Sequence, residues 1–209
     1  MNIKIVRSDD VYRKLMEAPK KKKNDIYRYE LMQPFQKKWE LIHVPMKAAA
    51  PGGYDVIMAS QMLGFLEPEQ VDATQKENVD KISDDEIWKA CGETVSKSLL
   101  RFEEAGIELP VEDYTFSILL ANKENPYIVL SEGCCGDGGI PGYVMVWLVP
   151  DEFTRKRLPA AVAHEVNHNV RFQKIAWRND ITLGEMMVSE GLAENFAVAF
   201  SERNVPVHG

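Results

Sequence analysis

The chain has 209 residues, of which 45% are hydrophobic and 27% charged, values that are ordinary for a globular protein with one sizeable core. Its formal net charge of −7 argues against a nucleic-acid partner, which would need a basic stripe. No apolar run approaches the roughly 20 residues that cross a bilayer, and residues 1–8 lack a signal-peptide core, so we expect a cytoplasmic protein with no membrane partner.

The first half of the chain is expected to be mainly helical. Short helices are predicted over residues 8–18, 25–41 and 54–63. Ser8 is the expected N-cap of the first helix, Pro34 should disturb the second, and Gly64 should end the third. The basic run at residues 20–23 is interpreted as a solvated linker between helices rather than a lipid or nucleic-acid patch.

A longer helix should follow these short ones. Ser83 and Glu86 have the spacing of a capping box, in which each side chain bonds the other's backbone N–H. The helix that they open is expected to run past Trp88 and Phe102 and to stop at Gly106.

The character of the sequence then changes to β-rich runs, at residues 114–120, 127–130 and 143–149. Between the last two runs lies the glycine-dense segment 133–139. It resembles neither a phosphate-binding P-loop nor a dinucleotide fingerprint, because no Lys-Ser/Thr pair and no helix follow it. Two interpretations stay open: an irregular connection between strands, or a loop that shapes the rim of a cleft.

The three cysteines are Cys91, Cys134 and Cys135. An odd number with two adjacent members does not indicate a disulfide framework. Because adjacent cysteines could only close a strained ring, we expect free thiols in a reducing compartment.

Two helices should end the chain. Pro159 suits the first turn of one helix, and the capping box of Thr182 and Glu185 should open the other, which reaches about Phe200. The order of helices, a small sheet and two further helices predicts an α+β fold. We expect a mainly helical region at 1–110 and a metal-binding region at 111–209, joined as one compact unit.

The strongest chemical signal is the run from His164 to His168, with Glu165 between the two histidines. Residues i and i+4 lie about 40° apart on one helix face, so both imidazoles can point at one metal ion. Glu165 would sit beside that metal without binding it, where it can take a proton from water. This H-E-x-x-H pattern is typical of zinc peptidases.

A catalytic zinc takes three protein ligands, so a third must come from elsewhere. Glu190 is the best candidate, because 22 residues let the chain turn and bring a second helix alongside. Glu194 lies one turn further on the same face, where it can accept the free ring N–H of a ligating histidine. Cys134 or Cys135 is a weaker candidate for the third ligand.

In this interpretation zinc would lower the pKa of water to about 7 and polarise the carbonyl of a peptide bond. Glu165 would act as the general base and then pass the proton to the leaving amine. The competing interpretation is structural: two histidines satisfied by neighbouring carboxylates, or a polar edge facing solvent. His43 and His208 are interpreted as non-ligands.

These residues resemble the gluzincin branch of zinc metallopeptidases, in which a glutamate on a downstream helix is the third ligand. Residues 190–193 look like the E-G-x-A stretch around that ligand. More narrowly, the segments 135–142, 163–171 and 189–197 resemble the YjaZ-like family of predicted zinc-dependent proteases. The resemblance implies a zincin-like fold, a zinc cofactor and a peptide or protein substrate.

One departure from the gluzincin pattern concerns the Tyr or His that steadies the transition state after the glutamate helix. Here only residues 201–209 follow Phe200, as in a truncated chain. Tyr143 or Arg171 could substitute for that group. The leading hypothesis is therefore a zinc-dependent peptidase. The alternatives are a non-catalytic zinc-binding regulatory protein and a metal-dependent hydrolase of a non-peptide bond.

Overall fold

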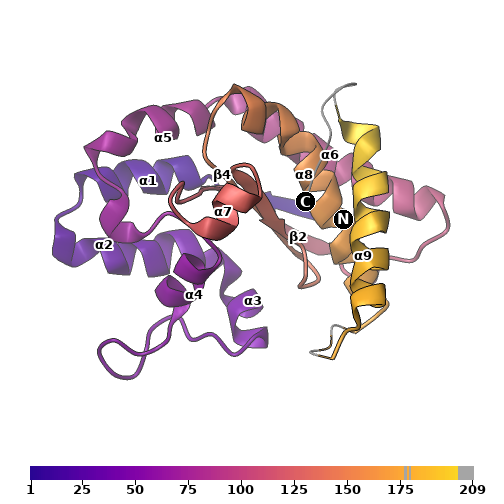
Figure 1. The fold of residues 1–209 in the computed structure, drawn as a ribbon, viewed down its shortest axis with the longest axis horizontal. Helices are drawn as coiled ribbons and strands as arrows, with labels where there is room; N and C mark the ends of the chain where they lie inside the picture. Colours follow the sequence, from indigo (N-terminus) through magenta and orange to yellow (C-terminus); the bar gives the residue numbers. More distant parts are fainter. Residues whose placement is uncertain (177, 179, 202–209) are drawn as a thin grey trace.

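A computed structural model describes residues 1–176, 178 and 180–201, and in it helices surround a four-stranded sheet (Figure 1). The strands are β1 (Asn2–Ile5), β2 (Asp113–Leu120), β3 (Cys134–Asp137) and β4 (Tyr143–Leu148), in the spatial order β1-β2-β4-β3. The first three in that order run parallel, and β3 pairs antiparallel to β4 at one edge. The fold is α+β, as predicted.

The described residues also form α1 (Ser8–Glu17), α2 (Lys20–Ile26), α3 (Gln36–Leu41), α4 (Val56–Met62), α5 (Lys76–Ile82), α6 (Asp85–Glu104), α7 (Pro126–Leu130), α8 (Glu152–Phe172) and α9 (Leu183–Ala197). Shorter helical turns lie at Tyr27–Met32, Gln33–Phe35, Pro68–Gln70, Ala73–Gln75 and Val198–Phe200. Of the helices in this described part, none combines the length and the apolar character needed to span a membrane.

The two central strands, β2 and β4, form the middle of the hydrophobic core. Every residue from Phe116 to Leu120 and from Val144 to Leu148 is buried, as expected for strands that are covered on both faces. Helix α8 contacts β3 and β4 and also packs against α6 and α9, while α1 and α5 contact β2. The sheet therefore forms the base on which α8 is fixed.

The N-terminal half differs from prediction in several places. It contributes β1, which pairs with residues 113–116 of β2 and was not expected. Ser8 lies inside α1 rather than capping it, because its buried hydroxyl donates to the carbonyl of Ile118. The basic run is not a linker but most of α2, and the buried Lys23 donates to the carbonyl of Val71.

Proline and glycine acted as predicted in this half. The helix disturbed near Pro34 passes from α2 through a π-helical and a 3₁₀ turn before α3 begins. Gly64 and Gly106 adopt φ of +83° and +78° just after their helices, a conformation that favours glycine. The N-cap of α6 is Asp84 rather than Ser83, since the Asp84 carboxylate accepts from the backbone N–H of Glu86.

The predicted strand at 127–130 is wrong, because these residues form α7. Asn125 caps this helix by accepting the N–H of Tyr127 at 2.9 Å, and Pro126 occupies the first turn, where its missing N–H costs little. The strand next to β4 is instead β3, built from the glycine-dense segment.

Helix α8 begins at Glu152, seven residues before the predicted start at Pro159. The capping box that opens it consists of Asp151 and Thr154. Pro159 therefore lies in the helix interior, where it removes one backbone hydrogen bond. Burial of apolar side chains at i, i+4 spacing offsets that loss, and these are Leu158, Val162, Val166 and Val170. The predicted capping box of Thr182 and Glu185 at the start of α9 is confirmed.

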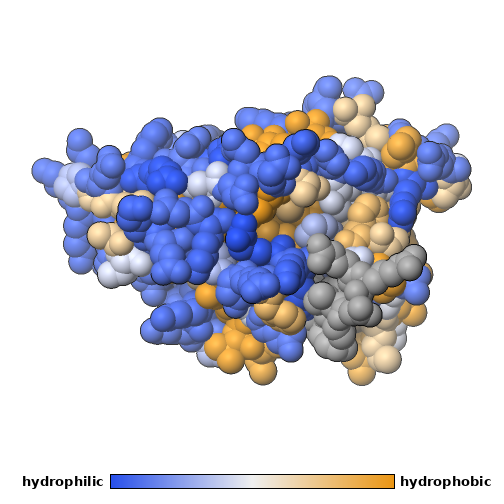
Figure 2. Space-filling view, turned by 90° about the horizontal axis from the view of Figure 1, so that it is seen from above, coloured by the Kyte–Doolittle hydropathy of each residue, from blue (hydrophilic) through white to orange (hydrophobic). Residues whose placement is uncertain are grey.

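The surface is divided by polarity (Figure 2). Seen from above, the side that carries α1, α2 and α5 is mostly hydrophilic, whereas hydrophobic surface gathers towards the side of α9. Helix α9 exposes large apolar residues along its length: Leu183, Met186, Met187, Val188 and Leu192. The residues that it buries, Ser189, Ala193 and Ala197, are all small.

Candidate metal centre

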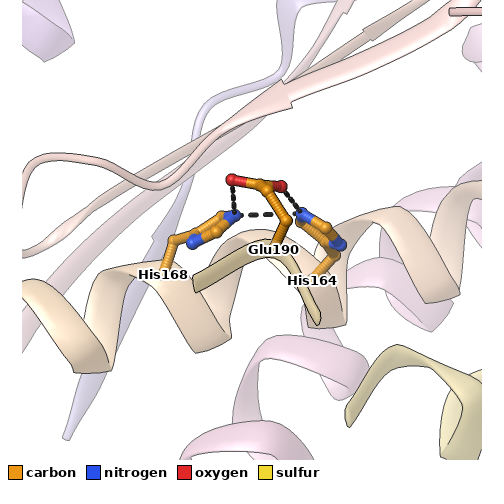
Figure 3. A group of neighbouring side chains, drawn as sticks. All are labelled: His164, His168 and Glu190. Carbon is orange, nitrogen blue, oxygen red and sulfur yellow. Dashed lines mark hydrogen bonds and ion pairs between the residues drawn. The ribbon is translucent and has the colours of Figure 1, made fainter. Parts of the chain in front are cut away.

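Helices α8 and α9 lie side by side and bring three predicted residues together (Figures 1 and 3). His164 and His168 project from one face of α8, with their Nε2 atoms 3.0 Å apart. Glu190 reaches over them from α9, with one carboxylate oxygen 3.2 Å from His164 Nε2 and the other 3.4 Å from His168 Nε2. Within the described ranges, this is the one group of three or more potential metal-binding side chains.

The opposite ring nitrogens of both histidines have partners of their own. Nδ1 of His164 lies 3.3 Å from a carboxylate oxygen of Glu194, the position predicted for that glutamate. Nδ1 of His168 lies 3.3 Å from the hydroxyl of Ser189, which is buried on α9. A partner at Nδ1 favours the tautomer with its proton there, which leaves Nε2 with a lone pair. Sequence reasoning missed Ser189, although it directly precedes Glu190.

With both protons on Nδ1, the two Nε2 atoms and the Glu190 carboxylate direct lone pairs at one another. Such a group needs a proton or a metal cation among its members. Imidazole and carboxylate are ligands of catalytic zinc, and donors held at about 2.0–2.2 Å from a tetrahedral zinc lie about 3.3 Å apart. The separations of 3.0, 3.2 and 3.4 Å are close to that value, so the donor set fits zinc.

The charges within the group are strongly coupled. Burial lowers the pKa of His164, but Glu190, Glu165 and Glu194 together outweigh burial and raise it above its ordinary value. Hydrogen bonds with His164 and His168 hold the pKa of Glu190 well below its ordinary value. The carboxylate is therefore ionised at neutral pH, the form that binds a cation.

Glu165 faces a different direction from the histidines. It is 8% exposed and lies against the glycine segment of β3. Burial raises the pKa of Glu165 to about 7, although His164 and His168 oppose the rise. A carboxyl group with a pKa near neutrality can take up and release a proton at neutral pH.

The three residues and Glu165 line one open cavity of about 450 Å³. Its other walls come from α7, from β3 and from the start of α9. The glycine-dense segment was predicted to be a loop, but residues 134–137 form the strand β3; as in the second interpretation, the segment borders the cavity. Sequence reasoning missed Tyr127 and Arg157 in this cavity, because no local motif marks them and only the packing of α7 and α8 brings them there.

The remaining candidates lie apart from the group or beside it. Tyr143 lines a separate hollow with Lys37 and Glu40, so it does not face the cluster. Cys134 and Cys135 line the cavity, yet neither belongs to the group of potential ligands. The other named residues are the exposed His43, Arg171 in the last turn of α8, and His208, which lies outside the described residues.

Comparison with known proteins supports a family of predicted zinc-dependent proteases but not the narrower gluzincin or YjaZ-like resemblance. A sequence model of the family described as "Predicted Zn-dependent protease (DUF2268)" matches residues 87–205. The chain is similar to "Uncharacterized protein YjfC" of Bacillus subtilis (strain 168), with 34% identity over 198 residues, which make up 94% of this chain and 65% of that protein. The chain thus spans less than two thirds of this relative's length. No solved structure matches it.

We expect the purified protein to bind about one zinc ion per chain, and His168→Ala to lose most of it, because two ligands hold zinc far less tightly than three. Elemental analysis and competition with a chromogenic chelator would measure this. His43→Ala, on an exposed histidine outside the cluster, is the matched control and should keep its zinc. Full occupancy in His168→Ala would remove the assignment.

Glu194→Ala should weaken zinc binding by about 10- to 100-fold without abolishing it, since we expect the side chain to orient His164, which it contacts at Nδ1, rather than to bind the metal. Glu190→Ala should have the larger effect. Zinc affinities of both variants, measured in the same buffer, show which of the two glutamates binds the metal. Complete loss of zinc in Glu194→Ala with normal binding in Glu190→Ala would reverse the two roles.

Proposed function

We propose that this chain, which belongs to the DUF2268 family of predicted Zn-dependent proteases, hydrolyses peptide bonds with zinc held by His164, His168 and Glu190. One observation carries the proposal: two imidazoles and a carboxylate converge at zinc-like separations in a cavity that also contains a buried glutamate. The proposal includes a gluzincin-type ligand order on a zincin-like pair of helices, α8 and α9.

Each residue has a distinct role in this proposal. Zinc, when bound, supplies Lewis acidity that lowers the pKa of water and polarises a carbonyl. Glu165 accepts the proton of the attacking water and delivers it to the amine that leaves. Glu194 and Ser189 orient the two imidazoles so that Nε2 faces Glu190, and they hold the proton of each ring on Nδ1.

Tyr127 is the proposed donor to the oxyanion that forms on the attacked carbonyl. It lines the same cavity as Glu165 and is half exposed, so its hydroxyl can meet a substrate. Burial raises the pKa of Tyr127, as do the nearby Cys135 and Glu165, which keeps the phenol protonated and able to donate. The backbone N–H of Tyr127 donates a hydrogen bond to the side-chain oxygen of Asn125, which fixes Tyr127 at the start of α7.

A non-catalytic, zinc-binding regulatory role is the competing function. The observation that favours it is the absence of any tyrosine or histidine between Glu190 and Ser201, the last residue described. Glu165 argues against it, because a purely structural metal site needs no buried carboxyl beside its ligands. The substrate is expected to be a peptide or protein segment.

Glu165→Gln should keep zinc and fold but lose about 10² to 10⁴-fold in peptide cleavage, because it preserves shape and removes the base. Turnover of a mixed peptide library, followed by mass spectrometry, measures this. Glu152→Gln, an exposed change in the same helix, is the control and should cleave normally. Equal cleavage by wild type and Glu165→Gln would refute the mechanism, and zinc binding without turnover by wild type would favour the regulatory role.

Tyr127→Phe should lower kcat by about 10² to 10³-fold with little change in KM, because the lost hydrogen bond acts on charge that develops only in the transition state. Zinc content should be unchanged. Tyr143→Phe, in the separate hollow, is the matched control and should retain wild-type kcat. If the two variants have the same kcat, Tyr127 is not the donor.

A further inference from the structure

The segment 136–139, which comprises the end of β3 and the two glycines after it, packs directly on Glu165. A side-chain carbon at Gly136 would overlap the Glu165 carboxyl group, and one at Gly138 would overlap its backbone carbonyl. The backbone N–H of Gly138 also donates to the Glu165 carboxylate. The position of this segment and the position of the carboxylate are therefore set together, with no room for another side chain between them.

One end of the segment is attached to α8 by Asn169, which is fully buried. Its side-chain amide lies 3.1 Å from the carbonyl of Gly138, 2.8 Å from that of Ile140 and 2.9 Å from that of Tyr143. Its carbonyl oxygen accepts the N–H of Gly142 at 2.9 Å. Asn169 lies directly after His168 and one helical turn after Glu165, so α8 itself holds the downstream end of the segment.

The other attachment comes from the opposite half of the sequence. Lys38, on α3, is 1% exposed, and its Nζ lies 2.8 Å from one carboxylate oxygen of Asp137. The other oxygen of Asp137 accepts the N–H of Gly139 at 2.9 Å. Lys38 Nζ also lies 4.2 Å from the centre of the Trp39 ring, a cation–π distance.

A lysine in this position needs a specific reason. Burying an ammonium group is costly unless an opposite charge and hydrogen bonds compensate for the lost water. The one ion-pair partner described for Lys38 is Asp137, whose side chain borders the candidate catalytic cavity. Lys38 lies outside the stretch 87–205 that the family model covers, so the motif-bearing region receives this charge from elsewhere in the chain.

We propose that Lys38 is a positioning residue for Glu165. Its ion pair with Asp137 holds the segment 136–139 against Glu165, so that the Gly138 amide keeps the carboxylate in one orientation beside the ligands. The inference rests on the proposed peptidase function for its catalytic consequence. The mechanical part, a lysine that immobilises the glycine segment, stands on the contacts alone.

Three variants test the inference: Lys38→Met, Asp137→Asn and the double variant. Lys37→Met is the matched control, because Lys37 is exposed and lies on the same helix. Zinc content, melting temperature, kcat and KM are measured for each full-length protein. Amide hydrogen exchange of the peptides that span residues 134–142 reports the mobility of the segment directly.

Lys38→Met should keep its zinc and its KM but lose about 10- to 100-fold in kcat, because small misplacements of a catalytic group are costly. Exchange in the segment should become faster, and Lys37→Met should match wild type. The double variant should be no worse than either single change, since both remove one interaction. Asp137→Asn, which nearly preserves shape, provides the same test if Lys38→Met does not fold.

A purely structural role would give a different pattern. The melting temperature would fall, while kcat and segment exchange measured well below melting would stay at wild-type values, and that result would overturn the inference. Hydrogen exchange also separates the two proposals. Unchanged exchange refutes the positioning role even in an active enzyme, whereas faster exchange in a protein without peptidase activity supports the immobilisation by Lys38 and refutes only the proposed function.

Discussion

The candidate site depends on one constraint, the angular spacing of side chains on α8. Neighbouring residues on a helix point about 100° apart, so the two histidines face α9 while Glu165 faces β3. The helix must therefore be enclosed closely on two sides. Small residues lie at both contacts and leave room for close approach: Gly136 on β3 and Gly138 just after it, and Ser189 and Ala193 on α9.

The second feature of the site is a concentration of hydrogen-bond acceptors with few donors. Glu190 is largely exposed while His164 and His168 are nearly buried, so the cluster is open to solvent on the side of α9. Besides the buried small side chains of α9, Glu190 and Glu194 make polar contacts with the histidines of α8. Cation binding at this cluster and the docking of α9 are thus expected to be coupled.

The N-terminal half is more than a support for the sheet. It supplies β1 at one edge and, through Lys38, a buried positive charge at the opposite end, next to β3. The core is continuous across both halves, with Phe65 packed on Trp147 of β4 at a ring distance of 4.7 Å. The geometry around Glu165 therefore depends on residues more than a hundred positions away in the sequence.

The sequence by itself determined whatever depends on local spacing. The i, i+4 histidines, the capping box at Thr182, the glycines that end α4 and α6, and the apolar runs of β2 and β4 could all be recognised from neighbouring residues. Only the tertiary structure decided which distant segments meet. The pairing of β1, the helix in place of a strand at 127–130, and the approach of Ser189, Tyr127 and Lys38 to the cavity follow from packing across the whole chain. Local patterns encode periodicity and caps, whereas burial and charge compensation are properties of the assembled core.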